Sequence, residues 1–272
     1  MGSVHYDFDF DNRYQFKEGT MSAATVVSLM DRIPVTGQVS LSVRLEEGTA
    51  ATRREADQTP FLRSLFRGPW GTSVYGQLVR GRHYVTYLQC LLEVYEALEA
   101  AMESLCGHPV VGGFLLPELW RSRAIEADLR CFLGDSWQEA PRPDHLSALH
   151  VERIRQLRVV APHLLVAHAY ARYARDILAG PVLASQVART FELSEEEGTA
   201  FFQAVKAESL ELLRLRGNGN LDKLPLTEEG KSEVVQEARL AFRLDTLLSD
   251  ALARESLGME ASRMGGGLGG LR

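Results

Sequence analysis

The spacing of hydrophobic residues predicts helices along most of the chain. The clearest pattern lies between residues 84 and 105, where apolar side chains recur every three or four positions and Gly107 follows the end of the run. Similar patterns predict helices at residues 45–57, 118–133, 144–157, 162–178, 182–190, 195–214 and 227–255. No strand pattern or internal repeat stands out. The sequence therefore predicts an all-α protein with a single helical domain.

Both ends of the chain lack this periodicity. Residues 1–42 predict one short helix, at 23–31, and we interpret them as an N-terminal extension. Residues 259–272 are rich in glycine, which is typical of a flexible tail. We therefore expect the helical domain to span residues 43–258. Within it, residues 61–81 predict a short helix followed by a loop with glycine and proline.

The composition excludes several classes of function. The net charge of −6 argues against a nucleic-acid or anionic-membrane partner, because such partners require a basic face. No apolar run reaches the roughly 20 residues that a transmembrane helix needs. The three cysteines are odd in number and lack the spacing of metal ligands. The acidic, aromatic N-terminus is unlike a signal peptide. A cytoplasmic location is the default expectation, and a mitochondrial one stays open.

Several segments, taken together and in their order, resemble the heme oxygenase family. They include LLPELWRSRAIEADLRCFLG at residues 115–134, LVAHAYARYARDILAGPVL at 165–183 and GKSEVVQEARLAF at 230–242. The resemblance runs from about residue 43 to residue 250. It implies a heme-oxygenase-like multihelical domain, in which a proximal histidine on the first helix binds heme iron. A distal helix, matching residues 165–183, would cover the other face of the heme.

The resemblance places Arg53 where the family has its proximal histidine. A guanidinium group is permanently protonated and has no lone pair to offer iron. The usual protein ligands of heme iron are His, Cys, Met and Tyr, and none of these occurs from Leu45 to Gln58. We therefore predict that Arg53 does not ligate iron and that the chain has no metal site.

The distal helix keeps one family feature and loses others. The resemblance assigns Asp176 the role of the distal aspartate, which orders water for proton delivery. Arg175 and Ala179 stand where the family has glycines, whereas Gly180 is retained. In the family these glycines let the helix approach the heme plane. The plain structural interpretation of Asp176 is an ion pair with Arg172 or Arg175.

The other heme-pocket positions implied by the resemblance also differ. Tyr170 and Arg172 belong to the distal run, and we favour packing between helices as their role. Two lysines that hold the heme carboxylates in the family correspond to Glu46 and Ala50, whereas Arg214 keeps a late basic position. Each exposed charge pair contributes only about 0–1 kcal/mol, but the losses accumulate. We expect heme binding to be weak or absent.

These residues leave three hypotheses for function. The first is a degenerate member of the family, a pseudoenzyme that binds a tetrapyrrole, another hydrophobic small molecule or an unidentified protein. The second is an active heme oxygenase, an oxidoreductase that cleaves heme to biliverdin, CO and iron with a non-histidine or water axial ligand. The third is another small-molecule enzyme on the same fold, because a fold does not determine function.

Overall fold

The described residues of the computed structural model are 39–62, 81–191, 193–194, 197–203 and 218–265. The chain divides into two units between Gln38 and Val39, and all described residues belong to the second unit. The predicted helix at 23–31, the loop at 63–80 and most of the predicted helix at 195–214 lie outside this description.

The described residues form helices and contain no strand, so the all-α prediction is confirmed. The α-helices are α2 (Leu41–Asp57), α4 (Gly81–Ser104), α5 (Ser122–Leu133), α6 (Asp144–Val160), α7 (Leu165–Phe191), α8 (Ala200–Gln203), α10 (Asn218–Leu221) and α11 (Glu228–Gly265). Four single-turn 3-10 helices connect them: η1 (Gly112–Phe114), η2 (Pro117–Leu119), η3 (Trp137–Glu139) and η4 (Pro162–Leu164).

Several helix boundaries differ from the sequence-based predictions; α5, for example, begins at Ser122, four residues later than predicted. Residues 162–178 and 182–190 were predicted as separate helices, but α7 continues through Pro181. Proline removes only one hydrogen bond of a helix, and Leu183 and Val187 beyond it are buried, so packing keeps the helix continuous. Helix α11 continues to Gly265, past the predicted end at residue 255 and into the predicted tail. Helix α2 begins at Leu41, four residues earlier than predicted.

The early start of α2 has a tertiary cause. The carboxylate of Asp222, next to α10, accepts hydrogen bonds from the Ser42 backbone N–H at 2.8 Å and from the Ser42 hydroxyl at 2.9 Å. It thereby satisfies a backbone donor that the first turn of a helix leaves unpaired. Because Asp222 is 180 residues away in sequence, the local pattern around residue 41 could not reveal this contact.

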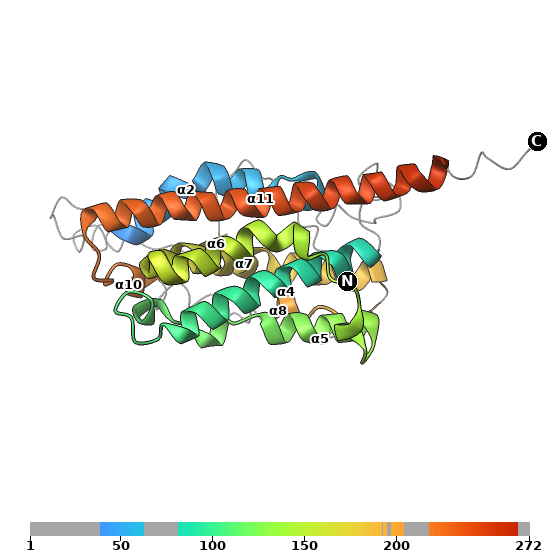
Figure 1. Ribbon diagram of the computed structural model, residues 1–272, viewed down its shortest axis with the longest axis horizontal. Coiled ribbons are helices and arrows are strands. Elements are labelled where there is room, and N and C mark those ends of the chain that lie inside the picture. Colours follow the sequence, from blue (N-terminus) through green and yellow to red (C-terminus); the bar gives the residue numbers. More distant parts are fainter. Residues whose placement is uncertain (1–38, 63–80, 192, 195–196, 204–217, 266–272) are drawn as a thin grey trace, which may run out of the picture. The chain divides into compact units, whose positions relative to one another are not determined.

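Helix α2 lies along α11, which brings the first and last described helices together (Figure 1). A glycine makes the close approach possible, because a Cβ at Gly48 would lie 2.6 Å from Val235 Cγ1. The Nε of Arg239 also donates a 2.6 Å hydrogen bond to the Gly48 carbonyl oxygen. The contact therefore combines a hydrogen bond from a side chain to the backbone with tight apolar packing.

The core lies where α4, α7 and α11 meet. The α4 residues Leu91 and Tyr95, the α7 residue Tyr173 and the α11 residue Phe242 are buried. The Tyr95 and Tyr173 rings lie 6.0 Å apart, and Phe201 meets Tyr95 edge-on at 5.9 Å. Full burial of a large apolar side chain contributes roughly 1.5–3 kcal/mol, so this core fixes the position of α7. None of the described helices has the length and apolar character needed to cross a bilayer.

Candidate functional site

Helices α2 and α7 carry most of the residues that the sequence analysis singled out, and Tyr170 connects the two helices. Tyr170 is 8% exposed. Burial raises the pKa of its hydroxyl, and the charge of Arg53 and a hydrogen bond with Thr49 partly offset that rise. The negative charge of Glu46, like burial, raises the pKa of Tyr170. The Tyr170 hydroxyl therefore lies among three polar side chains of α2, two of which are predicted site positions.

The α2 face around Tyr170 is built by helical spacing. Glu46, Thr49 and Arg53 follow one another at intervals of three and four residues, which places them on one side of the helix. Thr49 is fully buried, and its hydroxyl donates to the Leu45 carbonyl oxygen at 2.7 Å. Arg53 and Ala50 are half-buried, whereas Glu46 is exposed.

This face does not fit an iron ligand. Helix α2 contains no His, Cys, Met or Tyr, and Arg53 is the half-buried side chain beside Tyr170. A guanidinium donates hydrogen bonds and cannot donate an electron pair to a metal. The described residues also contain no group of three or more His, Cys, Asp or Glu side chains placed to hold a metal ion.

The distal-helix residues fall into two groups. Arg175, Asp176 and Ala179 belong to the continuous helix α7, but their side chains lie outside the description, as does Arg214 altogether. Gly180 is buried, and a Cβ there would lie 2.6 Å from the Phe202 carbonyl oxygen of α8. Contact between α7 and α8 is therefore sufficient to explain the glycine at this position.

Arg172 lies in the core, directed toward α4 and α11. Its Nη1 donates to Asp245 Oδ1 of α11 at 2.5 Å, and its guanidinium lies 5.1 Å from the centre of the Tyr95 ring of α4. The sequence predicts packing between helices as the role of Arg172, with an ion pair to Asp176 as the alternative. Asp245 is a partner that sequence spacing did not reveal.

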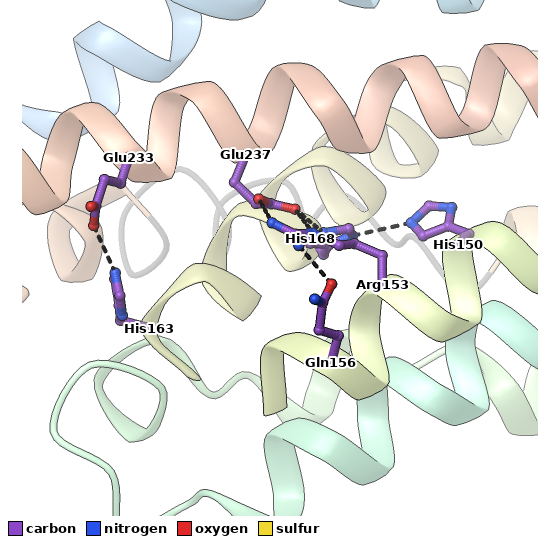
Figure 2. Close-up of polar contacts among 7 residues, drawn as sticks. All are labelled: His150, Arg153, Gln156, His163, His168, Glu233 and Glu237. Carbon is purple, nitrogen blue, oxygen red and sulfur yellow. Dashed lines mark hydrogen bonds and ion pairs between the residues drawn. The ribbon is translucent and has the colours of Figure 1, made fainter. Parts of the chain in front are cut away.

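A second polar group, missed by the sequence analysis, lies between α6, α7 and α11 (Figure 2). His150 Nε2 lies 3.1 Å from His168 Nδ1, and His168 Nε2 lies 3.0 Å from Glu237 Oε1. Arg153 donates to both oxygens of Glu237, at 2.9 and 2.6 Å. Glu237 lies 69 residues from His168 in sequence, so no local spacing indicated this group.

Two cavities open elsewhere on the described surface. One, of about 370 Å³, lies near the start of α11 between His108, His163 and Glu233. His108 Nδ1 accepts hydrogen bonds from the backbone N–H groups of Val110 and Val111, so a neutral ring keeps its proton on Nε2. The other, of about 410 Å³, is lined mainly by apolar residues of α4, α5 and their neighbours. Neither cavity is lined by α2.

Known proteins resemble this chain over most of its length. The model of the Heme oxygenase family matches residues 39–250. The heme oxygenase of Takifugu rubripes is 32% identical over 215 residues, which cover 79% of this chain and 74% of that protein. The heme oxygenase of Guillardia theta is 28% identical over 206 residues, which cover 76% of this chain and 83% of that protein.

Solved structures agree with these sequence matches. The crystal structure of heme oxygenase-1 from the cyanobacterium Synechocystis in complex with heme gives a TM-score of 0.71 at 26% identity, covering 83% of this chain and 99% of that chain. The structure of heme oxygenase from Leptospira interrogans gives a TM-score of 0.68 at 27% identity, covering 78% of this chain and 100% of that chain. Because the family model matches more than half of the residues and the helical fold agrees, this chain belongs to the heme oxygenase family.

Proposed function

We propose that this member of the heme oxygenase family does not carry out normal heme turnover and acts instead as a binding protein. Its expected ligand is a tetrapyrrole or another hydrophobic small molecule. The observation that carries the proposal is α2, which presents Arg53 beside Tyr170 and has no side chain of the kinds that usually bind heme iron. The similarity to heme oxygenases implies an iron-binding histidine on the first helix. Helix α2 departs from that expectation, because it contains no histidine.

The charge of Arg53 adds to the loss of an iron ligand. A half-buried cation that faced the positive iron would be repelled by it and would lose water without gaining a partner. The basic positions that would hold the heme carboxylates are also reduced, because Glu46 and Ala50 carry no positive charge. Together these changes are expected to weaken heme binding more than any one of them alone.

The first test is a titration of the full chain with hemin, followed by addition of a reductant. We expect no spectrum of axial histidine ligation and no biliverdin, because α2 supplies no imidazole. Absorbance spectra and product extraction measure both quantities. Formation of biliverdin at an ordinary rate would overturn the proposal.

The second test restores a ligand at the same place. Arg53→His should strengthen hemin binding by roughly tenfold or more, about 1.4 kcal/mol, and should produce an axial-imidazole Soret band. The matched control is Arg54→His, which adds the same side chain at the exposed neighbouring position. Equal spectra from the two variants would show that position 53 does not face the heme.

One observation favours the alternative of an active heme oxygenase with an unusual ligand. The Tyr170 hydroxyl lies near Arg53, and a neighbouring cation stabilises the phenolate form that could bind iron. Burial acts more strongly in the opposite direction and raises the pKa of Tyr170, so we rank this alternative second. If it holds, Tyr170→Phe should abolish the hemin spectrum, and Asp176→Ala should abolish turnover while hemin still binds.

A further inference from the structure

The cavity of about 410 Å³ lies between α4, the end of α5 and the end of α7. Its lining comes from all three helices and includes Val85 and Gln89 of α4, Phe132 and Leu133 of α5, and Phe191 of α7. Small-molecule sites in proteins usually enclose roughly 300–1,000 Å³ and combine apolar and aromatic walls with a few polar groups. This cavity therefore has the size and the lining of a ligand site.

Two phenylalanine rings form aromatic walls of the cavity. The ring centres of Phe132 and Phe191 lie 5.1 Å apart, and the rings meet edge-on at 71°. Fully buried Tyr84 contacts both rings, at 5.4 Å from Phe132 and 5.6 Å from Phe191. Each ring is thus held by two others, so the walls are in place before a ligand binds. Such rings attract the edge or the face of a further aromatic ring.

One polar side chain of the lining has a fixed orientation. Gln89 is only 7% exposed, and its Nε2 donates a 3.1 Å hydrogen bond to the Pro141 carbonyl oxygen. Because a carbonyl oxygen can only accept, the NH2 end of the amide must face Pro141. The Oε1 end accepts no hydrogen bond within the described part of the chain. Gln89 therefore offers a ligand one acceptor in a set direction.

The lining also limits the charge of a ligand. None of the described residues around the cavity is acidic, basic or a histidine. A charged group loses free energy when it leaves water without a partner, so neither a heme carboxylate nor an organic cation would be stabilised here. A metal ion would find no imidazole, thiolate or carboxylate among these residues. The cavity is suited to a neutral molecule.

We propose that this cavity is a second ligand site, which binds a neutral aromatic molecule with one hydrogen-bond donor, such as a phenol or an indole. The ring of the ligand lies against Phe132 and Phe191, and its O–H or N–H donates to Gln89 Oε1. Leu133, which is 37% exposed, lies at the edge and is partly covered by the ligand. No residue of α2 contributes to the site, so the inference does not depend on heme binding.

The test compares the β isomers of three probes that share the naphthalene ring. Naphthol carries an O–H, methoxynaphthalene has no donor, and naphthalenesulfonate is an anion. Each is titrated into the full chain and followed by amide NMR spectra, in which the shifts should centre on residues 85–89 and 132–141. Naphthol should bind roughly three- to tenfold more tightly than methoxynaphthalene, as expected for one neutral hydrogen bond, and the sulfonate should bind most weakly. Equal affinities for naphthol and methoxynaphthalene would overturn the proposal.

The role of Gln89 is isolated by Gln89→Met, which keeps the length of the side chain and removes the amide. The preference for naphthol should disappear, because no acceptor remains for its O–H. The two affinities are compared within one variant, so a change of cavity shape that affects both probes cancels. Gln138→Met, at an exposed amide, is the matched control and should keep the preference. A wild-type preference in Gln89→Met would reject Gln89 as the acceptor and the proposal with it.

The location is tested by Ala140→Trp, which also decides the question if the Gln89 variant does not fold. Ala140 lines the cavity, so a tryptophan there should fill it and weaken naphthol binding by roughly tenfold or more, about 1.4 kcal/mol. Ala148→Trp, at an exposed position of α6, is the matched control. Hemin in excess should leave naphthol binding unchanged. Displacement of naphthol by hemin, or full binding in Ala140→Trp, would show that no second site exists here.

Discussion

Single residues in this protein are constrained mainly by partners far away in sequence. Gly180 illustrates this. The resemblance to heme oxygenases implied a glycine that faces heme, whereas the structure places it against the backbone of α8. A Cβ at this position would lie only 2.6 Å from the Phe202 carbonyl oxygen. Carbonyl oxygens of a packed helix cannot move away as a flexible side chain can. The position therefore requires glycine for packing, whatever ligand the site binds.

This contact predicts that Gly180→Ala is destabilising. We expect a loss of about 1–3 kcal/mol in the free energy of unfolding, as for overpacked core positions. Urea denaturation measures it. Gly107→Ala is the matched control, because a Cβ there meets nothing within 4 Å. Equal stabilities for the two variants would contradict the tight contact between α7 and α8.

The same distinction explains which site residues the sequence could reveal. The proposed replacement of the iron ligand by Arg53 can be inferred from the sequence because it depends on a local segment that can be matched to a family. The partners of Arg172 and His168 are Asp245 and Glu237, which lie 73 and 69 residues away. No local pattern encodes such pairs, so the buried network emerged only from the fold.

At the scale of helices, local periodicity predicted which segments form helices better than it predicted where those helices begin and end. The apolar stripes of α4, α5 and α6 are local properties of the sequence, and the ends of these helices lie within four residues of the predicted ones. Boundaries depend on contacts that the pattern does not contain. Helix α7 passes through Pro181 because burial on both sides offsets one lost hydrogen bond, and α2 begins early because Asp222 satisfies its first turn.

The Asp222 contact gives a prediction for α2. Asp222→Ala should lower the free energy of unfolding by about 0.5–2 kcal/mol, the range measured for the loss of helix N-terminal caps. The first turn of α2 should also fray. Amide hydrogen exchange at residues 41–44 reports the fraying, and chemical denaturation reports the energy. Lys223→Ala, at the adjacent exposed position, should change neither quantity. A protected first turn in Asp222→Ala would show that α2 needs no cap from α10.

For the molecule as a whole, buried titratable groups determine how stability depends on pH. Burial lowers the pKa of His150 from 6.5 to about 3, so between these values the unfolded chain takes up a proton that the folded chain does not. Stability therefore falls as pH falls below 6.5. The pKa of Glu237 is lowered from 4.5 to about 2, so this group also makes stability fall as pH falls below 4.5.

Asp128 opposes these two groups. Burial raises its pKa to about 6, although the backbone N–H groups of Phe201 and Ala200 donate to its carboxylate. The folded state then takes up the proton first, and stability rises as pH falls from about 6 to 3.8. The contribution of Asp128 to the dependence of stability on pH is therefore opposite in sign to those of His150 and Glu237.

The contribution of His150 can be isolated by substitution. His150→Gln removes the titrating ring, so the thermal unfolding midpoint should fall less steeply between pH 6.5 and 3 than in the wild type. Calorimetry across this range measures the slope. His145→Gln, at a side chain that is 70% exposed, should leave the slope unchanged. A wild-type slope in His150→Gln would mean that this histidine is not the group that resists protonation in the folded state.

The pairing of α2 with α11 also sets a schedule for biosynthesis. The Gly48 carbonyl oxygen receives its hydrogen bond from a residue 191 positions later. At the usual pace of a ribosome, about 5–20 residues per second, that partner emerges roughly 10–40 s after α2. During this interval the apolar side of α2 has no α11 to cover it. The domain therefore cannot close until α11 has been synthesised, and chaperones have that interval in which to bind the nascent chain.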